Sequence, residues 1–391
     1  MASTPAAPEV VQPIDMLRRL VAFDTVSAHS NIALIEHAAE YLAGHGIAAE
    51  TRRSPDGAKA DLIASIGPPE PGGVVLSGHT DVVPVEGQDW QTDPFTLTER
   101  DGRLYGRGAA DMKGFIAVAL ALVPEFIAAR PRRPLHLVLS YDEEVGCLGA
   151  PGLIARLQSD FPAAQAAIIG EPTSMKLANA HKGISAFETR ITGKPAHSSN
   201  PDAGVNAINT AAELIRFLET LMADFKARGG DARFTPPHAT LSVGTIDGGN
   251  AVNIIAENCT LGWECRSVTG DETDEILSRV EHYCAETLLP VMRGRWAEAA
   301  IETRRLANVP PLRSGTGNAA EELVRRLTGQ NQAGVISFAA EAGLFQEAGI
   351  DAVICGPGSI DQAHQANEYI EIAQLDACAA FLRKLAQWAA E

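Results

Sequence analysis

Acidic and imidazole side chains follow several of the short apolar runs in this sequence or flank its longest apolar segment. The residues in question are His79, Asp81, Asp111, Glu143, Glu144, Glu171 and His364. In open α/β sheets, ligands collect at the carboxyl ends of the strands, so we expect these side chains to converge in one crevice. Two imidazoles and three carboxylates are the donors that a pair of zinc ions requires. The spacing therefore predicts a two-metal centre.

Each of these residues alone has an ordinary structural explanation. Asp111 would be a good N-cap for the helix that follows it. A lone histidine at a strand end is usually just hydrogen-bonded, and Glu143 with Glu144 would usually be a solvated pair. Their coincidence in one domain favours the metal centre. Three ligand carboxylates and a bridging hydroxide would neutralise two zinc ions, which leaves Glu143 free to move protons.

Two stretches of the chain carry the alternation of helices and strands that is typical of α/β domains. The first runs from about residue 14 to residue 181, and the second begins at residue 315. Helical patterns are expected over 32–42, 112–129, 319–328 and 375–388. Compact apolar runs, typical of strands covered on both faces, occupy 74–76, 135–139, 166–169 and 352–355. Residues 1–182 and 309–391 are therefore predicted to form one catalytic α/β domain.

The segment between these stretches, residues 183–308, has a different pattern. Strands with alternating polar positions are expected over 184–191, 239–246, 259–267 and 299–306, and helices over 207–227 and 272–288. The order strand-helix-strand-strand-helix-strand predicts an inserted α+β module of the ferredoxin-like kind.

Composition narrows the possible functions. The chain has 391 residues, enough for two domains, and a formal net charge of -17, which disfavours nucleic acid as a partner. Its six cysteines form no CxxC pair, so we expect them to be reduced and buried. The start of the chain, 1–13, has no signal-peptide pattern, and no apolar run approaches the ~20 residues that span a bilayer. A cytoplasmic protein without a membrane partner is expected.

Other functional classes fit the sequence poorly. The stretch 106–111 reads G-x-G-x-x-D and lacks the third glycine of a dinucleotide-binding turn. A serine hydrolase would need a G-x-S-x-G elbow, which is absent from the sequence. A non-catalytic binding protein would be expected to lack one of the metal ligands or the base, whereas this chain has all five predicted ligands and Glu143.

The motifs together resemble the di-zinc peptidase and deacylase family, in particular its acetylornithine deacetylase branch. Succinyl-diaminopimelate desuccinylase, aminoacylases and dipeptidases belong to the same family. The matching stretches are SGHTDVVP (77–84), YGRGAADMKG (105–114), DEEVGCLGA (142–150), GEPT (170–173), GKPAHSS (193–199) and AHQANEYI (363–370). The resemblance implies a zinc aminopeptidase-like catalytic domain with a mixed sheet, and an inserted module that serves as lid and dimer interface.

The resemblance also implies a role for each metal ligand. His79 and Glu171 would bind one zinc ion, Glu144 and His364 the other, and Asp111 both. Cobalt is a possible substitute for zinc. A cis peptide bond between Asp111 and Met112 is implied as well.

Further roles are implied outside the ligand set. Asp81 would orient the imidazole of His79, and Glu143 would be the general base. Asn253 and Arg266 would bind substrate. His197 would reach the active site of the partner subunit in a homodimer and help to hold the oxyanion.

The implied reaction is removal of the acetyl group from N-acetyl-L-ornithine, giving L-ornithine and acetate, as in arginine biosynthesis. The segment Ser337-Phe338-Ala339-Ala340-Glu341-Ala342 resembles the S-F-G-T-E-A form of the acetylornithine branch, with two alanines in place of Gly-Thr. Glu341 could offer an acid to the substrate ammonium. A related N-acyl-amino-acid deacylase, a desuccinylase or a dipeptidase remains the alternative.

Overall fold

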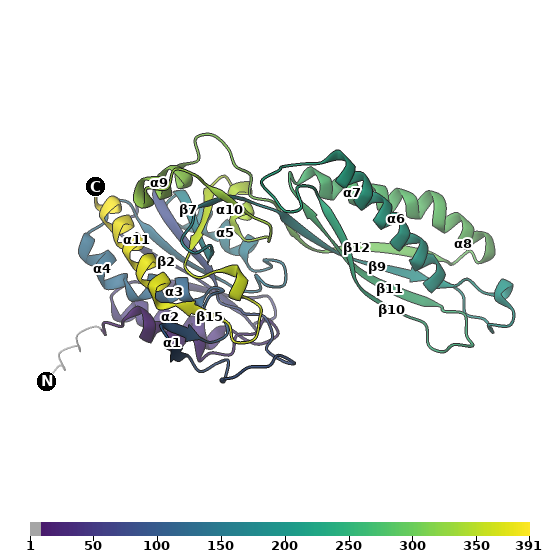
Figure 1. Cartoon of the computed structure of the whole chain (residues 1–391), viewed down its shortest axis with the longest axis horizontal. Helices are drawn as coiled ribbons and strands as arrows, with labels where there is room; N and C mark the ends of the chain where they lie inside the picture. Colours follow the sequence, from purple (N-terminus) through teal and green to yellow (C-terminus); the bar gives the residue numbers. More distant parts are fainter. Residues whose placement is uncertain (1–8) are drawn as a thin grey trace. The chain divides into compact units, whose positions relative to one another are not determined.

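The computed structural model describes residues 9–391 (Figure 1). Residues 1–8, part of the segment in which no signal peptide is expected, lie outside the described residues. The chain divides into two compact units. Within the described residues, unit 1 comprises 9–180, Leu312–Gly334 and Ala340–Glu391, and unit 2 comprises His181–Pro311 and Val335–Ala339.

The division differs from the expected domain boundaries at one segment. Val335–Ala339 was expected in the catalytic domain but clusters with unit 2. Part of the reason is local, because the Ser337 hydroxyl donates a hydrogen bond to the carbonyl oxygen of Thr235. The two long boundaries lie within three residues of those expected.

A mixed sheet of eight strands in the described chain lies in unit 1, except for the ends of its last two strands, His181 and 335–336, which belong to unit 2. In spatial order the strands are β1 (Ala49–Arg53), β2 (Ala60–Ile66), β6 (Leu135–Ser140), β3 (Gly73–His79), β7 (Ala164–Pro172), β14 (Asp351–Gly356), β8 (Ala178–His181) and β13 (Gly334–Ile336). The central strands β6, β3, β7 and β14 run parallel to one another, whereas β1, β2 and β8 pair antiparallel. Every residue of β3 and β6 is buried, as expected for strands that are covered on both faces.

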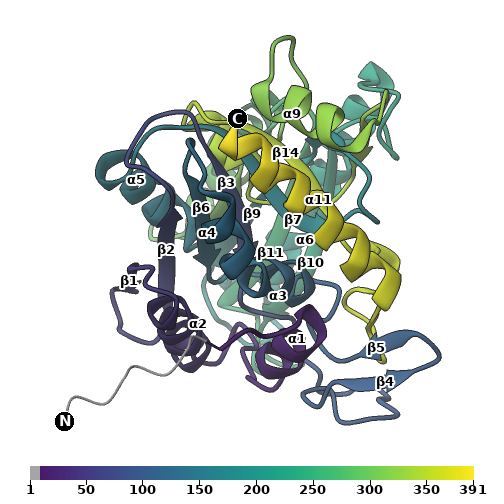
Figure 2. The ribbon, with the colours of Figure 1, turned by 90° about the vertical axis from the view of Figure 1, so that its left-hand side faces the viewer.

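Helices cover this sheet, and α3, α4 and α11 lie in front of it in Figure 2. The helices of unit 1 are α1 (Pro13–Val21), α2 (Ile32–Gly44), α3 (Lys113–Ala121), α4 (Val123–Ala129), α5 (Ala150–Asp160), α9 (Ala319–Thr328), α10 (Ala342–Glu347), α11 (Ile372–Ala390) and the single turn η3 (Ile360–Gln362). A small antiparallel sheet joins β15 (Tyr369–Glu371), β5 (Arg103–Tyr105) and β4 (Thr98–Arg100). It places the segment after His364 beside the segment before Asp111.

One predicted helix is two. The sequence pattern favoured a continuous helix over 112–129, but α3 ends at Ala121 and α4 begins at Val123. Pro124 lies in the first turn of α4. Because proline lacks the backbone N–H and its ring clashes with the preceding turn, it is accommodated at a helix start and not inside a helix.

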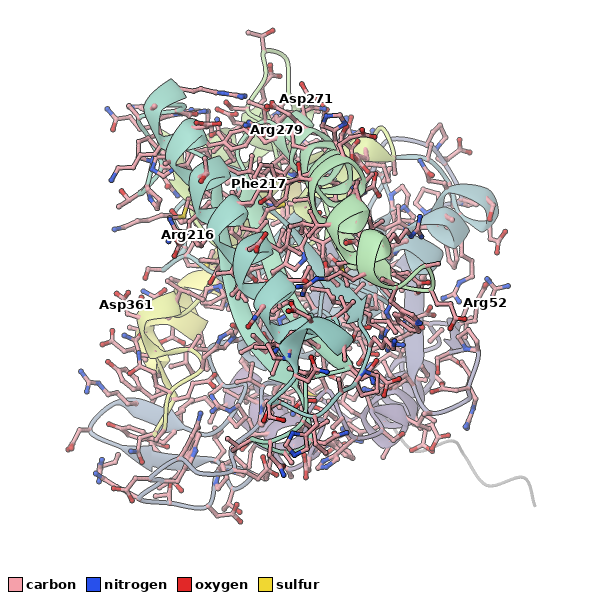
Figure 3. The ribbon with its side chains drawn as sticks, turned by 90° about the vertical axis from the view of Figure 1, so that its right-hand side faces the viewer. Arg52, Arg216, Phe217, Asp271, Arg279 and Asp361 are labelled. Atoms are coloured by element: carbon pink, nitrogen blue, oxygen red, sulfur yellow. The ribbon has the colours of Figure 1, made fainter. Side chains whose placement is uncertain are left out.

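Unit 2 has the predicted order of elements. Its sheet contains β10 (Thr240–Gly248), β11 (Asn258–Ser267), β9 (Gly183–Thr192) and β12 (Ala300–Val309), and its helices and turns are η1 (Pro201–Ala203), α6 (Ala207–Arg228), α7 (Asp271–Tyr283), the π-helical turn η2 (Cys284–Leu288) and α8 (Leu289–Arg295). All neighbouring strands are antiparallel. Figure 3 looks onto α6 and α7, where Phe217 stacks on Tyr283 with ring centroids 4.0 Å apart.

Two further expectations concern the whole chain. All six cysteines are free and buried, as predicted. None of the helices within residues 9–391 combines the length and the apolar character needed to cross a membrane.

Candidate active site

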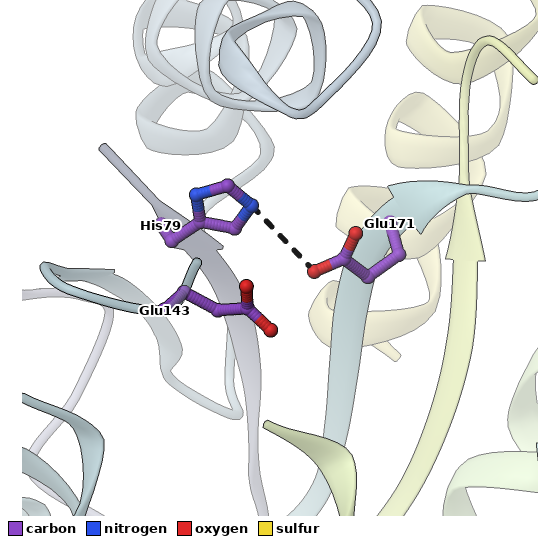
Figure 4. A group of neighbouring side chains, drawn as sticks. All are labelled: His79, Glu143 and Glu171. Carbon is purple, nitrogen blue, oxygen red and sulfur yellow. Dashed lines mark ion pairs between the residues drawn. The ribbon is translucent and has the colours of Figure 1, made fainter. Parts of the chain in front are cut away.

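The parallel strands of unit 1 bring three of the predicted residues to one edge of the sheet. β3 ends at His79, β7 carries Glu171 near its end, and the segment after β6 carries Glu143. Since β3 is paired in parallel with both β6 and β7, the three carboxyl ends meet. Figure 4 shows the result: the three side chains point toward one another, with His79 Nε2 3.7 Å from Glu171 Oε1.

Asp111 lies between the two predicted histidines. Its Oδ1 is 3.1 Å from His79 Nε2, and its Oδ2 is 3.3 Å from His364 Nε2. Each carboxylate oxygen therefore faces a different imidazole, which is the arrangement that a bridging ligand needs. Asp111 precedes the N-cap of α3, which is Met112, and its side chain does not cap the helix. The peptide bond between these two residues is cis, as the resemblance implied.

The second imidazole is held on a loop. His364 follows η3, has a positive φ of 63°, and its side chain is 51% exposed. Its Nε2 lies 3.0 Å from Glu144 Oε2. The structure thus brings together all five predicted ligands, His79 with Glu171 on one side of Asp111 and His364 with Glu144 on the other.

The cluster also contains Glu143, which the family resemblance implies to be the general base. Burial raises the pKa of its carboxyl well above the ordinary value; the charge of His79 opposes this, and those of Glu144 and Glu341 add to it. The thiol of Cys147 donates a hydrogen bond to Glu143 Oε1 at 3.4 Å. A raised pKa makes a carboxylate a stronger base, and its protonated form can then serve as the acid. Glu143 also lies close enough to His79 and Glu171 to share a cation with them.

Asp81 contacts His79 in a different way from the one expected. The Nδ1 atom of His79 is 2.9 Å from the backbone carbonyl oxygen of Asp81 and 3.6 Å from its Oδ1. The carboxylate of Asp81 instead accepts hydrogen bonds from the backbone N–H groups of Glu143 and Glu144, at 3.1 and 3.3 Å, and from the Ser27 hydroxyl at 2.7 Å. Asp81 therefore joins the histidine to the loop that carries the two glutamates.

This contact decides which nitrogen of His79 is free to bind a cation. A carbonyl oxygen only accepts hydrogen bonds, so Nδ1 must carry the proton in the neutral ring. The lone pair is then on Nε2, which faces Asp111 and Glu171. Histidine ligands of metals are typically held in this way by a hydrogen bond from their other nitrogen.

The electrostatics of the cluster also fit a cation site. Burial raises the pKa of Glu171 and of Glu144, and the nearby charge of Asp111 raises both further. Hydrogen bonds with Asp111 and Glu144 raise the pKa of His364 to about 10. The Oε1 atom of Glu171 is buried and has no hydrogen-bond partner in the described part of the chain. A centre with this excess of buried negative charge and mixed nitrogen and oxygen donors suits divalent cations.

The donor groupings leave one ambiguity. Ligand atoms of His79, Glu143 and Glu171 lie within 4.8 Å of one another, and so do those of His79, Asp111 and Glu144. Distance alone would therefore accept Glu143 as a ligand. The two oxygens of Asp111 facing two imidazoles favour Asp111 as the shared ligand, with Glu143 beside it.

Glu341 lies beneath this cluster and not on an open surface. It is 1% exposed, and its Oε2 accepts a hydrogen bond from the Ser77 hydroxyl of β3 at 3.1 Å. Burial raises the pKa of its carboxyl. An action of Glu341 on a substrate ammonium stays a prediction.

The remaining predicted residues belong to unit 2. His197 is exposed, its Nδ1 lies 2.7 Å from Ser199 Oγ, and the next residue, Ser198, donates its N–H to the carbonyl oxygen of Asn253 at 3.0 Å. His197 and Asn253 therefore lie on adjoining loops. Arg266, on β11, is half-buried and pairs with Glu264 at 3.0 Å.

Two residues that the sequence analysis did not single out lie next to the cluster. Arg107 and Glu368 form an ion pair in which both residues are 1% exposed. Each belongs to one of the motifs that carry the family resemblance, YGRGAADMKG and AHQANEYI. The sequence signal for each of the two residues is a charged side chain inside such a motif that is not needed as a metal ligand.

Comparison with known proteins agrees with the motifs. Residues 75–388 match the profile of peptidase family M20/M25/M40. Acetylornithine deacetylase from Yersinia pseudotuberculosis is 38% identical over 376 residues, which cover 93% of this chain and 94% of that protein. A metallo-carboxypeptidase of the M20 family from Sulfolobus solfataricus has a similar structure, with a TM-score of 0.75 and 18% identity over 97% of this chain and 99% of that one.

A dinuclear metal-binding peptidase of the M20 family from Bacillus subtilis also shares the fold, with a TM-score of 0.65 and 17% identity over 96% of this chain and 97% of that one. These structural likenesses agree with the mixed-sheet α/β architecture. Because the profile match and the similarity to the Yersinia protein both extend over most of the sequence, the chain belongs to peptidase family M20/M25/M40.

Proposed function

We propose that this chain is a di-zinc amidohydrolase that converts N-acetyl-L-ornithine and water to L-ornithine and acetate. The observation that carries the chemistry is Asp111, whose two carboxylate oxygens face His79 on one side and His364 on the other. The substrate is supported by the Yersinia relative, which bears the name acetylornithine deacetylase. The reaction would supply ornithine to arginine biosynthesis.

The five ligands would hold two zinc ions, with cobalt as a possible substitute. His79 and Glu171 would bind one ion, His364 and Glu144 the other, and Asp111 both. Two bound cations would lower the pKa of a water molecule toward ~7 and polarise the carbonyl group of the amide.

The protein's own part in the reaction falls mainly to Glu143. Its buried carboxylate would accept a proton from the attacking water and deliver it to the departing amine nitrogen, so the same residue acts first as base and then as acid. The raised pKa of Glu143 suits both steps. The thiol of Cys147 and the contacts of Asp81 hold the loop from which Glu143 reaches the cluster.

Substrate binding is proposed for residues of unit 2. Arg266 offers a planar guanidinium that can bind a carboxylate through two hydrogen bonds, once its pairing with Glu264 is exchanged. Asn253 offers an amide on the loop beside His197.

We also propose a homodimer in which His197 serves the active site of the partner subunit. Exposed apolar residues next to His197 support an interface here: Val252 is 103% exposed, and Ile254, which forms a β-bridge with His197, is 45% exposed. β10 is an edge strand of its sheet among the described residues. Exposed edges and apolar residues of this kind are commonly covered by association.

The free cysteines agree with a cytoplasmic location.

Initial rates on a panel of substrates test the proposed function. Zinc-loaded protein is assayed on N-acetyl-L-ornithine, N-acetylcitrulline, N-acetylmethionine, N-succinyl-diaminopimelate and dipeptides. We expect kcat/KM to be highest for N-acetyl-L-ornithine. A higher value for a succinylated or peptide substrate would reassign the chain within its family, and no hydrolysis of any substrate would refute the proposal.

Mixing of two defective variants tests the role of His197. His197→Ala removes one oxyanion donor, typically worth about 3 kcal/mol to the transition state, and Glu143→Gln removes the base. A mixed dimer would contain one site with both defects and one with neither, so activity should return. If verified heterodimers stay as inactive as the two parents, His197 does not act across an interface.

A further inference from the structure

Arg107 and Glu368 are two charged residues buried next to the predicted metal ligands. Arg107 Nη1 donates to Glu368 Oε2 at 2.7 Å, and neither residue is more than 1% exposed. Burying both members of an ion pair is costly unless their remaining hydrogen-bonding groups are also satisfied. An ion pair of this kind is therefore weak evidence for a role in stabilising the fold alone. The other hydrogen bonds of Arg107 and Glu368 indicate what the pair holds in place.

The second oxygen of Glu368 holds the backbone of the predicted bridging ligand. Glu368 Oε1 accepts hydrogen bonds from the N–H groups of Ala110, at 2.9 Å, and of Asp111, at 3.1 Å. Both oxygens of this carboxylate are thus occupied, one by Arg107 and one by the segment that presents Asp111. Displacement of Glu368 would release that segment directly.

The Nη atoms of Arg107 also make contacts that lead to the loop that carries His364, whereas its Nε has no hydrogen-bond partner among the described residues. Nη1 also lies 3.3 Å from the carbonyl oxygen of Gln365, and Nη2 donates to Gln88 Oε1 at 2.5 Å. The amide nitrogen of Gln88 in turn donates to the carbonyl oxygen of His364 at 3.1 Å. Arg107 therefore contacts the backbone of Gln365 directly and the backbone of His364 through the side chain of Gln88.

These contacts matter because His364 lies on a loop and not on a strand of the sheet. It follows the single turn η3, its side chain is 51% exposed, and its positive φ is one that residues other than glycine seldom adopt. His79, by contrast, ends a fully buried strand. The pair Arg107–Glu368 connects the backbone of Asp111 to the backbone of His364, two ligands that lie more than 250 positions apart in the sequence.

We propose that Arg107 and Glu368 are positioning residues for one of the two cations, the one bound by Asp111, Glu144 and His364. This rests on the proposed two-metal centre. Loss of the pair lowers the affinity for that cation more than for the cation at His79 and Glu171, because Asp111 serves both cations whereas His364 serves only this one. Residues that orient metal ligands typically contribute 10–100-fold to metal affinity.

Glu368→Gln is the central variant for this proposal. A glutamine amide has one acceptor oxygen, so it satisfies either Arg107 or the two N–H groups, but not both sets. Zinc content per chain is measured by mass spectrometry after dialysis at defined free zinc, and the two dissociation constants by titration with a chromophoric chelator. We expect two zinc ions in the wild type, and in the variant a rise of roughly 10–100-fold in the dissociation constant at His364 and Glu144, with a smaller rise in the other.

A matched control separates positioning from stability. Asp61 and Arg156 form another buried ion pair of unit 1, 4% and 7% exposed, with no contact to a predicted ligand among the interactions described for them. Asp61→Asn should lower the melting temperature and leave both zinc dissociation constants unchanged. A milder variant, Gln88→Ala, keeps the Arg107–Glu368 ion pair and removes the link to His364, together with the acceptor oxygen that Gln88 offers to Arg107 and Trp90, so the same constant should rise by a smaller factor.

The outcomes distinguish this inference from the proposed function. Two unchanged dissociation constants in both Glu368→Gln and Gln88→Ala would overturn the positioning role. An equal loss of both zinc ions in these variants would also overturn it, because the effect would not be greater on one side. A wild-type protein that binds fewer than two zinc ions would instead refute the two-metal centre itself.

Discussion

The two sides of the candidate metal centre are built differently. His79 and Glu171 lie on β3 and β7 of a parallel sheet, and their side chains are 1% and 4% exposed. His364 and Glu144 lie on loops, and their side chains are 51% and 8% exposed. Asp111 contributes one carboxylate oxygen to each side.

This difference shows two ways of fixing a ligand. Strand pairing sets the positions of His79 and Glu171, because the register of β3 with β7 is determined by backbone hydrogen bonds and by the buried core. No such pairing holds His364 in the described structure; side-chain hydrogen bonds from Gln88 and Arg107 to its segment take that part. We call the site of His79 and Glu171 the sheet side and the site of His364 and Glu144 the loop side. We therefore expect the cation on the loop side to be bound more weakly than the cation on the sheet side.

The largest expected effect separates two neighbours on one loop. Glu143→Gln should keep both zinc ions and lower kcat by roughly 10²–10⁴, the usual contribution of a positioned acid–base group. Glu144→Gln should lose the loop-side zinc, because it removes a charged ligand next to His364. Steady-state kinetics together with zinc analysis would check both. If the two variants exchange these behaviours, the assignment within the pair is reversed.

A smaller effect concerns the sheet that supports His79. His136 of β6 lies opposite Val75 of β3, and neither of its ring nitrogens has a hydrogen-bond partner within residues 9–391. Burial lowers the pKa of His136 from 6.5 to about 4. The unfolded chain therefore takes up the proton first. The stabilising contribution is complete above about pH 6.5 and is lost as the pH falls toward about 4.

Urea unfolding of the wild type and of His136→Leu would measure this contribution. Between pH 7.5 and pH 5, the variant should gain about 2 kcal/mol in the free energy of unfolding relative to the wild type, because leucine does not titrate. The comparison at pH 7.5 corrects for any change in packing. A difference between the two proteins that does not vary with pH would contradict the prediction.

The smallest effect tests the order in which the cations leave. When chelator is added, the zinc ion at His364 and Glu144 should be released at least about tenfold faster than the one at His79 and Glu171, a difference of about 1.4 kcal/mol in barrier. Activity should disappear with the first release, and added zinc or cobalt should restore it. Release of both ions in a single phase, or full activity in metal-free protein, would contradict the comparison.

Much of this molecule could be predicted from its sequence because the informative features are local. The buried runs before His79 and Glu171, each followed by a polar ligand, give both the strand and the chemistry in one short stretch. The change from buried to alternating strands near Gly183 marks unit 2 in the same way. Even the cysteines follow from composition and spacing.

The remainder depends on contacts between distant segments. The ion pair of Arg107 with Glu368 joins residues 261 positions apart, and neither segment alone indicates that it is buried. The apolar pattern continues through Leu122 and does not indicate the break between α3 and α4. Only Pro124 marks the start of a second helix. Asp81 lies beside His79, but its carboxylate holds the backbone of the glutamate loop, which only the folded chain reveals.

The central claim is that two cations share Asp111 between a sheet side and a loop side. Crystals of the zinc-loaded protein, with anomalous difference maps recorded on both sides of the zinc absorption edge, test this most directly. We predict two peaks, ~3.5–4 Å apart, one bound by His79 and Glu171 and the other by His364 and Glu144, with one oxygen of Asp111 on each. A single peak, or Glu143 in place of Asp111 as the shared ligand, would contradict it.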